Sequence, residues 1–329
     1  MLSKIMNIFK IFFFIFIIIL NNNSLADEKF NRWLIEYKKY AEQNGVSKKT
    51  INIAFKDVRF LKKIITYDRK QPEFIEKTNI YISKRITKKK INSAKRLLRE
   101  NKKLLNKVEL EFKIPREYLV ALWGVETHFG RHKGKVDIIS ALATLSYDKR
   151  RSQFFSNELL IILKLIDNNV VNIDSLVGSW AGAHGNFQFM PSSIQNYALD
   201  YDLDKKIDLY LSLEDSFASA ANYLKKIGWD KNPWGFKVSI KEELNKKYIS
   251  TDARKLKKKL SIKRWKKLGV IIPENKSINL KLKGTLIRPD GNSGDFYLVF
   301  NNYEKLLHWN RSLRFAITIG IFSDYLKNV

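Results

Sequence analysis

The chain has 329 residues, of which 61 are Lys or Arg and 33 are Asp or Glu, so its formal net charge is +28. Because it contains no cysteine, disulfide bonds, thiolate metal sites, cysteine nucleophiles and lipid-modified cysteines are all excluded. An apolar content of 45% allows a large core and excludes a wholly disordered protein. The excess of positive charge predicts a nonspecific attraction to polyanions, and a bias toward Lys along the whole chain accounts for part of it.

Residues 1–26 are expected to be a secretory signal peptide. Lys4 and Lys10 precede or flank the apolar run Ile11 to Leu20, and the small residues Ser24 and Ala26 follow it. This order is typical of a cleaved export signal. An uncleaved membrane anchor is the alternative, but the run is shorter than the ~20 residues that a spanning helix needs. We expect a periplasmic protein with no membrane anchor after cleavage, and export argues against a nucleic-acid partner.

The remaining chain divides into three segments of different character. Residues 27–112 have a helical period with few breakers and predict an N-terminal helical lobe. Glycines and aromatic residues are frequent in residues 113–240, where loops are expected to shape a site. Residues 241–329 begin with a Lys-rich stretch, for which the solvated face of a helix is expected.

The last part of the chain predicts a small β element and a helix. Apolar residues alternate at the start of Ile278 to Phe300, and the turn Pro289-Asp290-Gly291 follows. A C-terminal helix is expected over about Asn310 to Leu326. The fold class is therefore expected to be mainly α (α+β).

A helix carrying a candidate acid is predicted between Ile114 and Gly130. Pro115 suits its first turn and Gly130 its end. Its apolar stripe has the spacing i, i+3, i+4, i+7 and comprises Leu119, Leu122, Trp123 and Glu126. A carboxyl group on such a stripe loses hydration, which raises its pKa and lets it hold a proton near neutral pH. The alternative is a position at the edge of the stripe, paired with a Lys or Arg.

Metal sites are weakly indicated. His128 and His132 are four residues apart, but Gly130 separates them and no HExxH motif surrounds them, so zinc is not expected. Asp200, Asp202 and Asp204 have the spacing of the first three ligands of a calcium loop, although Lys occupies the following Gly position. Calcium there is the weaker prediction, and a solvated acidic turn is the stronger one.

Several short strings occur in one order along the chain. They are DRKQPEF (Asp68 to Phe74), WGVETHFG (Trp123 to Gly130), ALATLS (Ala141 to Ser146), Arg150-Arg151 with Phe154-Phe155, GSWAGAHGNFQFMPSS (Gly178 to Ser193), AANYLKKIGW (Ala220 to Trp229) and Asn310-Arg311-Ser312. Together they closely resemble the lytic murein transglycosylase B family over most of the chain that follows the signal.

The resemblance implies a lysozyme-like catalytic core at residues 113–240 and a non-hydrolytic reaction on peptidoglycan glycan strands. The bond between N-acetylmuramic acid and N-acetylglucosamine would be cleaved with Glu126 as the single general acid and base, which leaves 1,6-anhydro ends. No cofactor is implied, and other wall-remodelling proteins are conceivable partners. A hydrolytic muramidase and a noncatalytic peptidoglycan-binding protein are the alternatives.

The resemblance also implies substrate-binding residues. Ser179 and Asn310 match positions near the reacting sugar, and Gln188 matches a sugar hydrogen-bonding position. Tyr81 would stack on a sugar, while Arg150 and Arg151 would bind a muramic carboxylate or peptide stem. The alternatives are caps for Ser179 and Asn310, a core position for Tyr81 and surface charge for the arginines.

Four residues depart from the pattern of the family. His184 replaces a Met and would place a titratable ring close to the site, while Phe187 replaces a smaller residue. Trp309 and Phe315 replace tyrosines, which removes two hydroxyl groups and keeps aromatic surface. These departures bear on specificity and rate.

Overall fold

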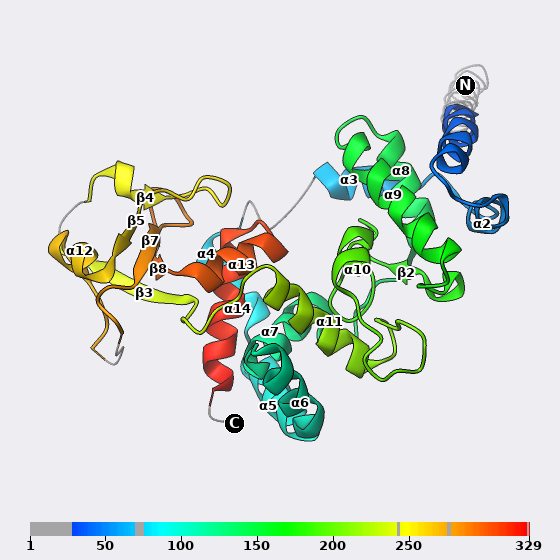
Figure 1. Ribbon diagram of the computed structural model, residues 1–329. Helices are drawn as coiled ribbons and strands as arrows, with labels where there is room; N and C mark the ends of the chain where they lie inside the picture. The colour runs from blue at the N-terminus through cyan, green and yellow to red at the C-terminus, as the bar shows by residue number, and fades with distance from the viewer. Residues whose placement is uncertain (1–27, 70–75, 242–243, 275–277, 328) are drawn as a thin grey trace, which may run out of the picture. The chain divides into compact units, whose positions relative to one another are not determined.

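The computed structural model describes residues 28–69, 76–241, 244–274, 278–327 and 329. The predicted signal peptide, residues 1–26, and most of the DRKQPEF string lie outside the described residues. The chain is mainly helical, with a small sheet formed late in the sequence (Figure 1), which confirms the predicted fold class. Within the described ranges, no helix combines the length and apolar character needed to cross a membrane.

The chain forms two compact units that interleave along the sequence. Unit 1 comprises residues 1–69, 134–184 and 189–195, and unit 2 comprises residues 70–133, 185–188 and 196–329. The chain therefore passes from one unit to the other several times. The domain boundaries expected at residues 112 and 240 stay a prediction.

Unit 1 is built around one buried helix. Its elements are a helix at residues 28–43, α2 (Lys48–Ala54), α3 (Lys62–Arg69), β1 (Val136–Asp137), α8 (Ile138–Tyr147), α9 (Ser152–Asp167), η2 (Ile173–Ser175), β2 (Val177–Gly178) and the start of α10 (Pro191–Tyr197). In α8, all residues from Ile138 to Ser146 are buried. Helices α9 and α3 pack against α8, and Asp137 caps its start by accepting a hydrogen bond from the Ser140 amide at 2.6 Å.

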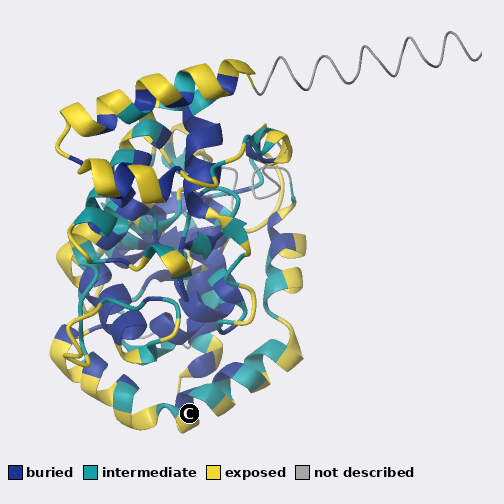
Figure 2. Cartoon of the chain, turned by 90° about the vertical axis from the view of Figure 1, so that its right-hand side faces the viewer, coloured by how far each residue is buried: buried dark blue, intermediate teal, exposed yellow. Residues whose placement is uncertain are grey.

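Unit 2 has a second buried helix at its centre. Its helices are α4 (Thr78–Arg85), α5 (Lys88–Glu100), α6 (Lys102–Phe112), α7 (Arg116–Thr127), α11 (Leu213–Lys226), α13 (Asn301–Trp309) and α14 (Leu313–Leu326). Helices α14, α5, α6 and α11 pack against α7, where every residue from Tyr118 to Gly124 is buried. Buried and exposed residues alternate along the outer helices (Figure 2), as expected for amphipathic helices on a core.

A six-stranded sheet with one short helix also belongs to unit 2. Its strands are β3 (Gly235–Ile240), β4 (Ile249–Ser250), β5 (Lys259–Ser261), β6 (Val270–Ile271), β7 (Lys283–Ile287) and β8 (Phe296–Val299). The short helix is α12 (Ile262–Lys267), and the 3₁₀ turn η3 (Lys246–Tyr248) precedes β4. The strand order is β4-β7-β8-β3-β6, and β5 pairs with β7. Trp265 of α12 is fully buried and donates a hydrogen bond to the Gly284 carbonyl at 2.9 Å, which fixes the helix on the sheet.

The Lys-rich stretch Lys241–Lys267 differs from its prediction. A helix was expected there, but within its described residues only η3 and α12 are helical, and β4 and β5 are strands. The prediction is wrong because only isolated apolar residues mark the strands in this stretch. Ile249 and Leu260 pack against the core of the sheet, and the lysines around them in the sequence are exposed. Asn245 and Asp252 also accept hydrogen bonds from backbone amides two residues on, which favours turns.

Candidate active site

Glu126 lies in the last turn of α7, where the helix reaches its end. His128 and Phe129 both have positive φ, 53° and 61°, so the chain turns away directly after the acid. The Glu126 side chain forms no ion pair with a described Lys or Arg; instead its Oε1 accepts a hydrogen bond from Trp309 Nε1 at 2.9 Å. Glu126 as a residue is partly exposed, yet burial of its carboxyl group raises its pKa to about 7, against a lowering by the Trp309 bond.

Trp309 is the last residue of α13 and is held among aromatic side chains. Its ring lies 4.7 Å from the Tyr223 ring and 6.3 Å from the Phe187 ring. The Tyr223 hydroxyl contacts His308 Nδ1 at 3.0 Å and donates to the His308 carbonyl at 3.3 Å, which ties α11 to the end of α13. Phe187, the larger residue noted in the sequence, thus supports the indole that contacts the acid.

A short loop of unit 2, residues 185–188, is fixed to α7 by Asn186. The Asn186 side chain accepts from Trp123 Nε1 at 3.1 Å and donates to the Leu209 and Tyr210 carbonyls, both at 3.2 Å. Thr127 Oγ1 donates to the Asn186 carbonyl at 2.8 Å. The loop is therefore anchored to the residue that follows Glu126 in the sequence.

Three predicted binding residues belong to unit 2 with Glu126. Asn310 directly follows Trp309 as the C-cap of α13. Gln188 has a φ of +51°, and its amide donates to the Lys133 carbonyl at 3.1 Å and the Gly185 carbonyl at 3.0 Å. Tyr81 is buried, and the Arg85 guanidinium lies 3.4 Å from the centre of its ring. Sugar binding by these residues stays a prediction.

The other predicted residues belong to unit 1. Ser179 Oγ accepts from the Ala181 and Ala183 amides at 3.2 and 3.1 Å, so it shapes the turn after β2. Arg150 and Arg151 both pair with the buried carboxylate of Asp68, where Arg150 Nε donates at 2.5 Å. The two side chains are 42% and 38% exposed. Their roles in substrate binding also stay predictions.

His184 belongs to unit 1 and is buried. Its Nδ1 lies 3.0 Å from the Val177 carbonyl oxygen, so the backbone of β2 helps to hold the ring. An influence of His184 on Glu126 stays a prediction. Phe315, the other departure, is buried in the first turn of α14.

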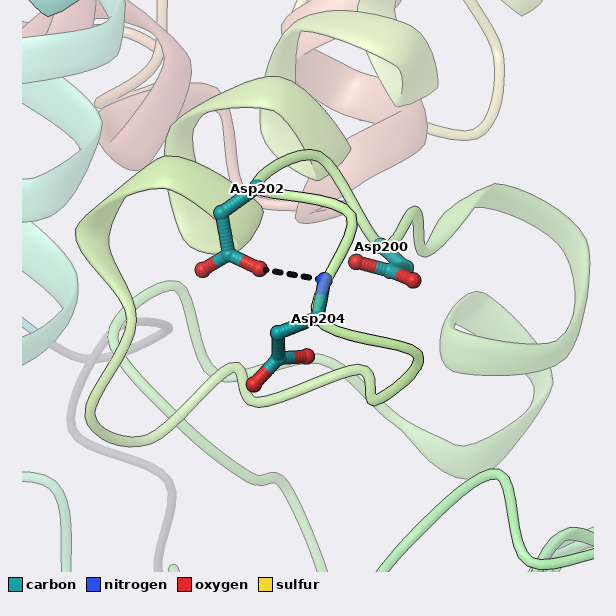
Figure 3. A group of neighbouring side chains, drawn as sticks. All are labelled: Asp200, Asp202 and Asp204. Atoms are coloured by element: carbon teal, nitrogen blue, oxygen red, sulfur yellow. Dashed lines mark hydrogen bonds between the residues drawn. The ribbon is translucent and has the colours of Figure 1, made fainter.

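The three aspartates of the acidic turn come together (Figure 3). Each of Asp200, Asp202 and Asp204 offers an oxygen within 4.8 Å of those of the other two. The turn holds them from within, because the Asp204 amide donates to Asp202 at 3.3 Å and the Lys205 amide to Asp200 at 2.9 Å. One oxygen, Asp200 Oδ1, is buried without a hydrogen-bond partner. Lys205 adopts the φ of +71° for which calcium loops use Gly.

Sequence reasoning missed the residues that support the acid. No role was predicted for Asn186, Thr127 or Tyr223. Trp309 was expected near the sugar rather than bonded to Glu126. The available signal was Asn186 itself, a polar residue between Gly185 and Phe187 in a segment rich in glycine and aromatic residues.

Comparisons with known proteins identify the family of the chain. The family model described as "Transglycosylase SLT domain" matches residues 29–324. The membrane-bound lytic murein transglycosylase B of Escherichia coli is 33% identical over 217 residues, which cover 65% of this chain and 58% of that protein. The chain thus aligns with little more than half the length of this curated relative.

Solved structures show the same fold. SltB3 from Pseudomonas aeruginosa in complex with NAG-anhNAM-pentapeptide has 30% identity and a TM-score of 0.83, covering 91% of this chain and 80% of that one. The Escherichia coli lytic transglycosylase Slt35 in complex with calcium has 27% identity and a TM-score of 0.75, covering 89% and 92%. The fold is therefore lysozyme-like, as predicted, and the chain belongs to the transglycosylase SLT domain family, among relatives of the lytic murein transglycosylase B type.

Proposed function

We propose that this protein is an exported lytic transglycosylase that acts on peptidoglycan in the periplasm. It cleaves the β-1,4 bond between N-acetylmuramic acid and N-acetylglucosamine and leaves 1,6-anhydro ends. The observation that carries the proposal is the carboxyl group of Glu126, which stands at the end of a buried helix, has a pKa raised to about 7 and forms no ion pair with a described cation. Such a group can both give and take a proton near neutral pH.

Glu126 performs both proton transfers in the proposed reaction. As an acid it protonates the glycosidic oxygen while the C1–O bond breaks, and the carbonyl oxygen of the neighbouring N-acetyl group bonds to C1. As a carboxylate it then removes the proton of the 6-hydroxyl, whose oxygen bonds to C1 and displaces the N-acetyl oxygen. Atoms balance without water, and the usual second carboxylate is not required.

Two relatives support the substrate. The Escherichia coli relative is named a murein transglycosylase, and the Pseudomonas aeruginosa structure contains NAG-anhNAM-pentapeptide, which includes an anhydro sugar of the kind that this reaction leaves. Glycan strands of peptidoglycan are therefore the proposed partner.

We assign the binding roles by the same resemblance. Gln188 and Asn310 lie in the unit that carries Glu126, and Asn310 is adjacent to the tryptophan bonded to it. Ser179, Arg150, Arg151 and Tyr81 are proposed as further contacts to sugar or peptide. For the arginines, the shared Asp68 leaves one net positive charge for a substrate carboxylate.

The acidic turn is suited to calcium in its donor set. Its three carboxylates, one of which has a buried oxygen without a partner, are hard oxygen ligands of the kind that Ca²⁺ prefers. Asp200, Asp202 and Asp204 would hold the ion, which would neutralise their mutual repulsion and stiffen the turn. Calcium is present in the Slt35 structure of Escherichia coli. The ion has no part in the proposed proton transfers.

Digestion of purified sacculi by the parent protein and by Glu126→Gln tests the proposal. The parent is expected to release muropeptides with anhydro ends, which mass spectrometry identifies because they are one water lighter than reducing ends. Glu126→Gln is expected to lose at least ~10³-fold of this activity, because the amide can neither donate nor accept the proton at that pKa.

Other outcomes favour the alternatives. Reducing ends alone would show a hydrolytic muramidase. Binding to sacculi without release of products, unchanged by Glu126→Gln, would show a noncatalytic peptidoglycan-binding protein. Asp167→Asn is a matched control because Asp167 accepts hydrogen bonds from Ser47 and Thr50 in unit 1, away from the acid in the chain.

A further inference from the structure

We infer that Trp309 is a positioning residue that gives the two oxygens of Glu126 different tasks: Oε1 accepts the indole N–H, and Oε2 carries the proton that is transferred. The inference rests on the proposed acid and base role of Glu126. It concerns this chain in particular, because the resemblance to the family predicts a tyrosine at position 309.

The chemistry of the indole makes the assignment. Trp Nε1–H is a donor only, whereas a tyrosine hydroxyl both donates and accepts. Trp309 Nε1 lies 2.9 Å from Glu126 Oε1, so this oxygen must present a lone pair to it. In a protonated carboxyl group the carbonyl oxygen is the better acceptor, so the proton belongs on Oε2. A tyrosine could turn its hydroxyl to suit either oxygen and would not make this distinction.

The surroundings of Trp309 restrict its ring. Tyr223 of α11 lies against it at 4.7 Å and an interplanar angle of 54°, and Phe187 meets it edge-on at 6.3 Å and 70°. Both supporting side chains are buried. Tyr223 is also bonded to the backbone of His308, which fixes α11 to the end of α13 beside the indole. The N–H therefore points at Glu126 before substrate binds.

The bond changes in strength through the reaction. When the proton leaves Oε2, the bond from Trp309 becomes charge-assisted and roughly twice as strong as a neutral one. It therefore stabilises the carboxylate at the moment when Glu126 becomes the base. In the resting protein the same bond lowers the pKa of Glu126 and opposes the larger effect of burial.

Two titratable side chains lie close to Trp309, Tyr223 of α11 and its neighbour in sequence, His308 of α13. On α11, burial raises the pKa of Tyr223 well above its ordinary value, so its hydroxyl keeps its proton. On α13, burial, Arg311 and Lys305 lower the pKa of His308, so its ring is neutral above pH 7. Phe187 and Asn186, from the loop at residues 185–188, carry no charge.

Direct titration of the carboxyl group tests the inference. Glutamate labelled with ¹³C at the carboxyl carbon is followed by NMR against pH in the parent, Trp309→Phe and Trp309→Tyr, with Glu126→Gln to assign the signal. Trp309→Phe is expected to raise the pKa of Glu126, and Trp309→Tyr, which returns a donor, to move it back toward the parent. Trp33→Phe, which removes an indole in unit 1, is the matched control and is expected to leave it unchanged.

The opposite result separates a positioning role from a packing role. If Trp309 only excludes water, its replacement by the smaller ring hydrates the carboxyl group and the pKa of Glu126 falls. An unchanged or lowered pKa in Trp309→Phe would therefore overturn the inference. The titration needs no turnover, so it stands apart from a failure of the proposed function, which sacculus digestion by Glu126→Gln detects. Thermal unfolding of each variant confirms that it is folded.

Kinetics give a second readout. Trp309→Phe is expected to lower kcat by at least tenfold and to change KM by less than threefold, because the lost bond acts on the reacting proton rather than on sugar binding. The alkaline limb of its pH profile is expected to move to higher pH. A rise in KM with kcat unchanged would instead identify Trp309 as a sugar-binding surface and contradict the inference.

Discussion

The raised pKa of Glu126 makes the free energy of unfolding depend on pH. Its pKa is about 7 in the folded chain and 4.5 for the free group. Between these values the unfolded chain has released the proton and the folded chain retains it, so the free energy of unfolding falls as pH rises from 4.5 to 7 and is level above.

Glu126→Gln is therefore expected to be more stable than the parent in mildly alkaline solution. The advantage should grow by about 2 kcal/mol between pH 5 and pH 8, because the neutral amide escapes the desolvation of the carboxylate. Urea unfolding of both proteins at the two pH values measures it. An advantage that does not change with pH would show that Glu126 is hydrated and that its pKa is not raised.

The pairing of Glu126 with its donor marks the limit of prediction at the residue scale. The buried stripe of Leu119, Leu122 and Trp123 follows from their spacing, whereas the role of Glu126 as the acid is a prediction from the resemblance to the family. Trp309 is 183 residues away in the chain, and no local pattern connects the two. Contacts of this kind depend on how the ends of α13 and α7 lie relative to each other. The sequence period of either helix does not predict that arrangement.

Helix α14 illustrates what holds the elements of unit 2 together. Trp234, which precedes β3, is buried against Gly320, and its Nε1 donates to Asp324 at 3.0 Å one turn further on. A Cβ at Gly320 would lie 2.2 Å from the Trp234 ring. The Trp234 indole thus packs directly on the backbone of α14 because Gly320 has no side chain, and α13 packs against the same helix.

Gly320→Ala is expected to destabilise the protein by roughly 1–3 kcal/mol, because the methyl group overlaps the buried Trp234 ring. Helix propensity alone predicts the opposite sign, a gain of about 1 kcal/mol. Chemical unfolding distinguishes the two. Tyr325→Ala, at an exposed position of the same helix, is the control and is expected to change stability by less than about 0.5 kcal/mol. A gain in stability for Gly320→Ala would show that the space between Gly320 and the Trp234 ring accommodates a methyl group.

The acidic turn gives a prediction for an irregular element. Calcium at about 1 mM, within the range of extracellular sites, is expected to raise the Tm of the parent by several degrees, because it neutralises three carboxylates that lie together. In Asp200→Asn the response should disappear, and Asp57→Asn, at an exposed position of unit 1, should keep it. If calcium leaves the Tm of the parent unchanged, the turn is a solvated one held by its own backbone.

The elements were predicted well where one period dominates and poorly where charge obscures it. Pro115 and the apolar stripe located α7, and the predicted C-terminal helix is α14, whose start is set by the Ser312 cap. In Lys241–Lys267 the strand residues Ile249 and Leu260 stand among lysines, and their partners in β7 follow later in the chain. Short strands that pair across such distances are specified by the sheet rather than by their own sequence.

At the scale of the whole molecule, the large excess of positive charge should govern the first encounter with the cell wall. Binding of the Glu126→Gln protein, which is expected to leave the sacculi intact, should weaken several-fold between about 0.05 and 0.2 M salt, since screening acts on exposed charges. Sacculi whose carboxylates have been converted to amides serve as the control and should show weaker binding with little dependence on salt. If binding to the amidated sacculi still weakens with salt, groups other than the peptide carboxylates attract the protein.

The interleaving of the two units has a consequence for how the gene can be divided. The helix whose last turn carries Glu126 and the helix that ends in Trp309 belong to the same unit, yet residues 134–184, which lie between them in the sequence, belong to the other. A fragment that stops at residue 240 would carry the acid without its donor, and one that starts later would carry the donor without its acid. Exchange of gene segments among relatives is therefore expected to keep activity only where the segment that supplies position 309 brings a side chain that can donate a hydrogen bond to Glu126.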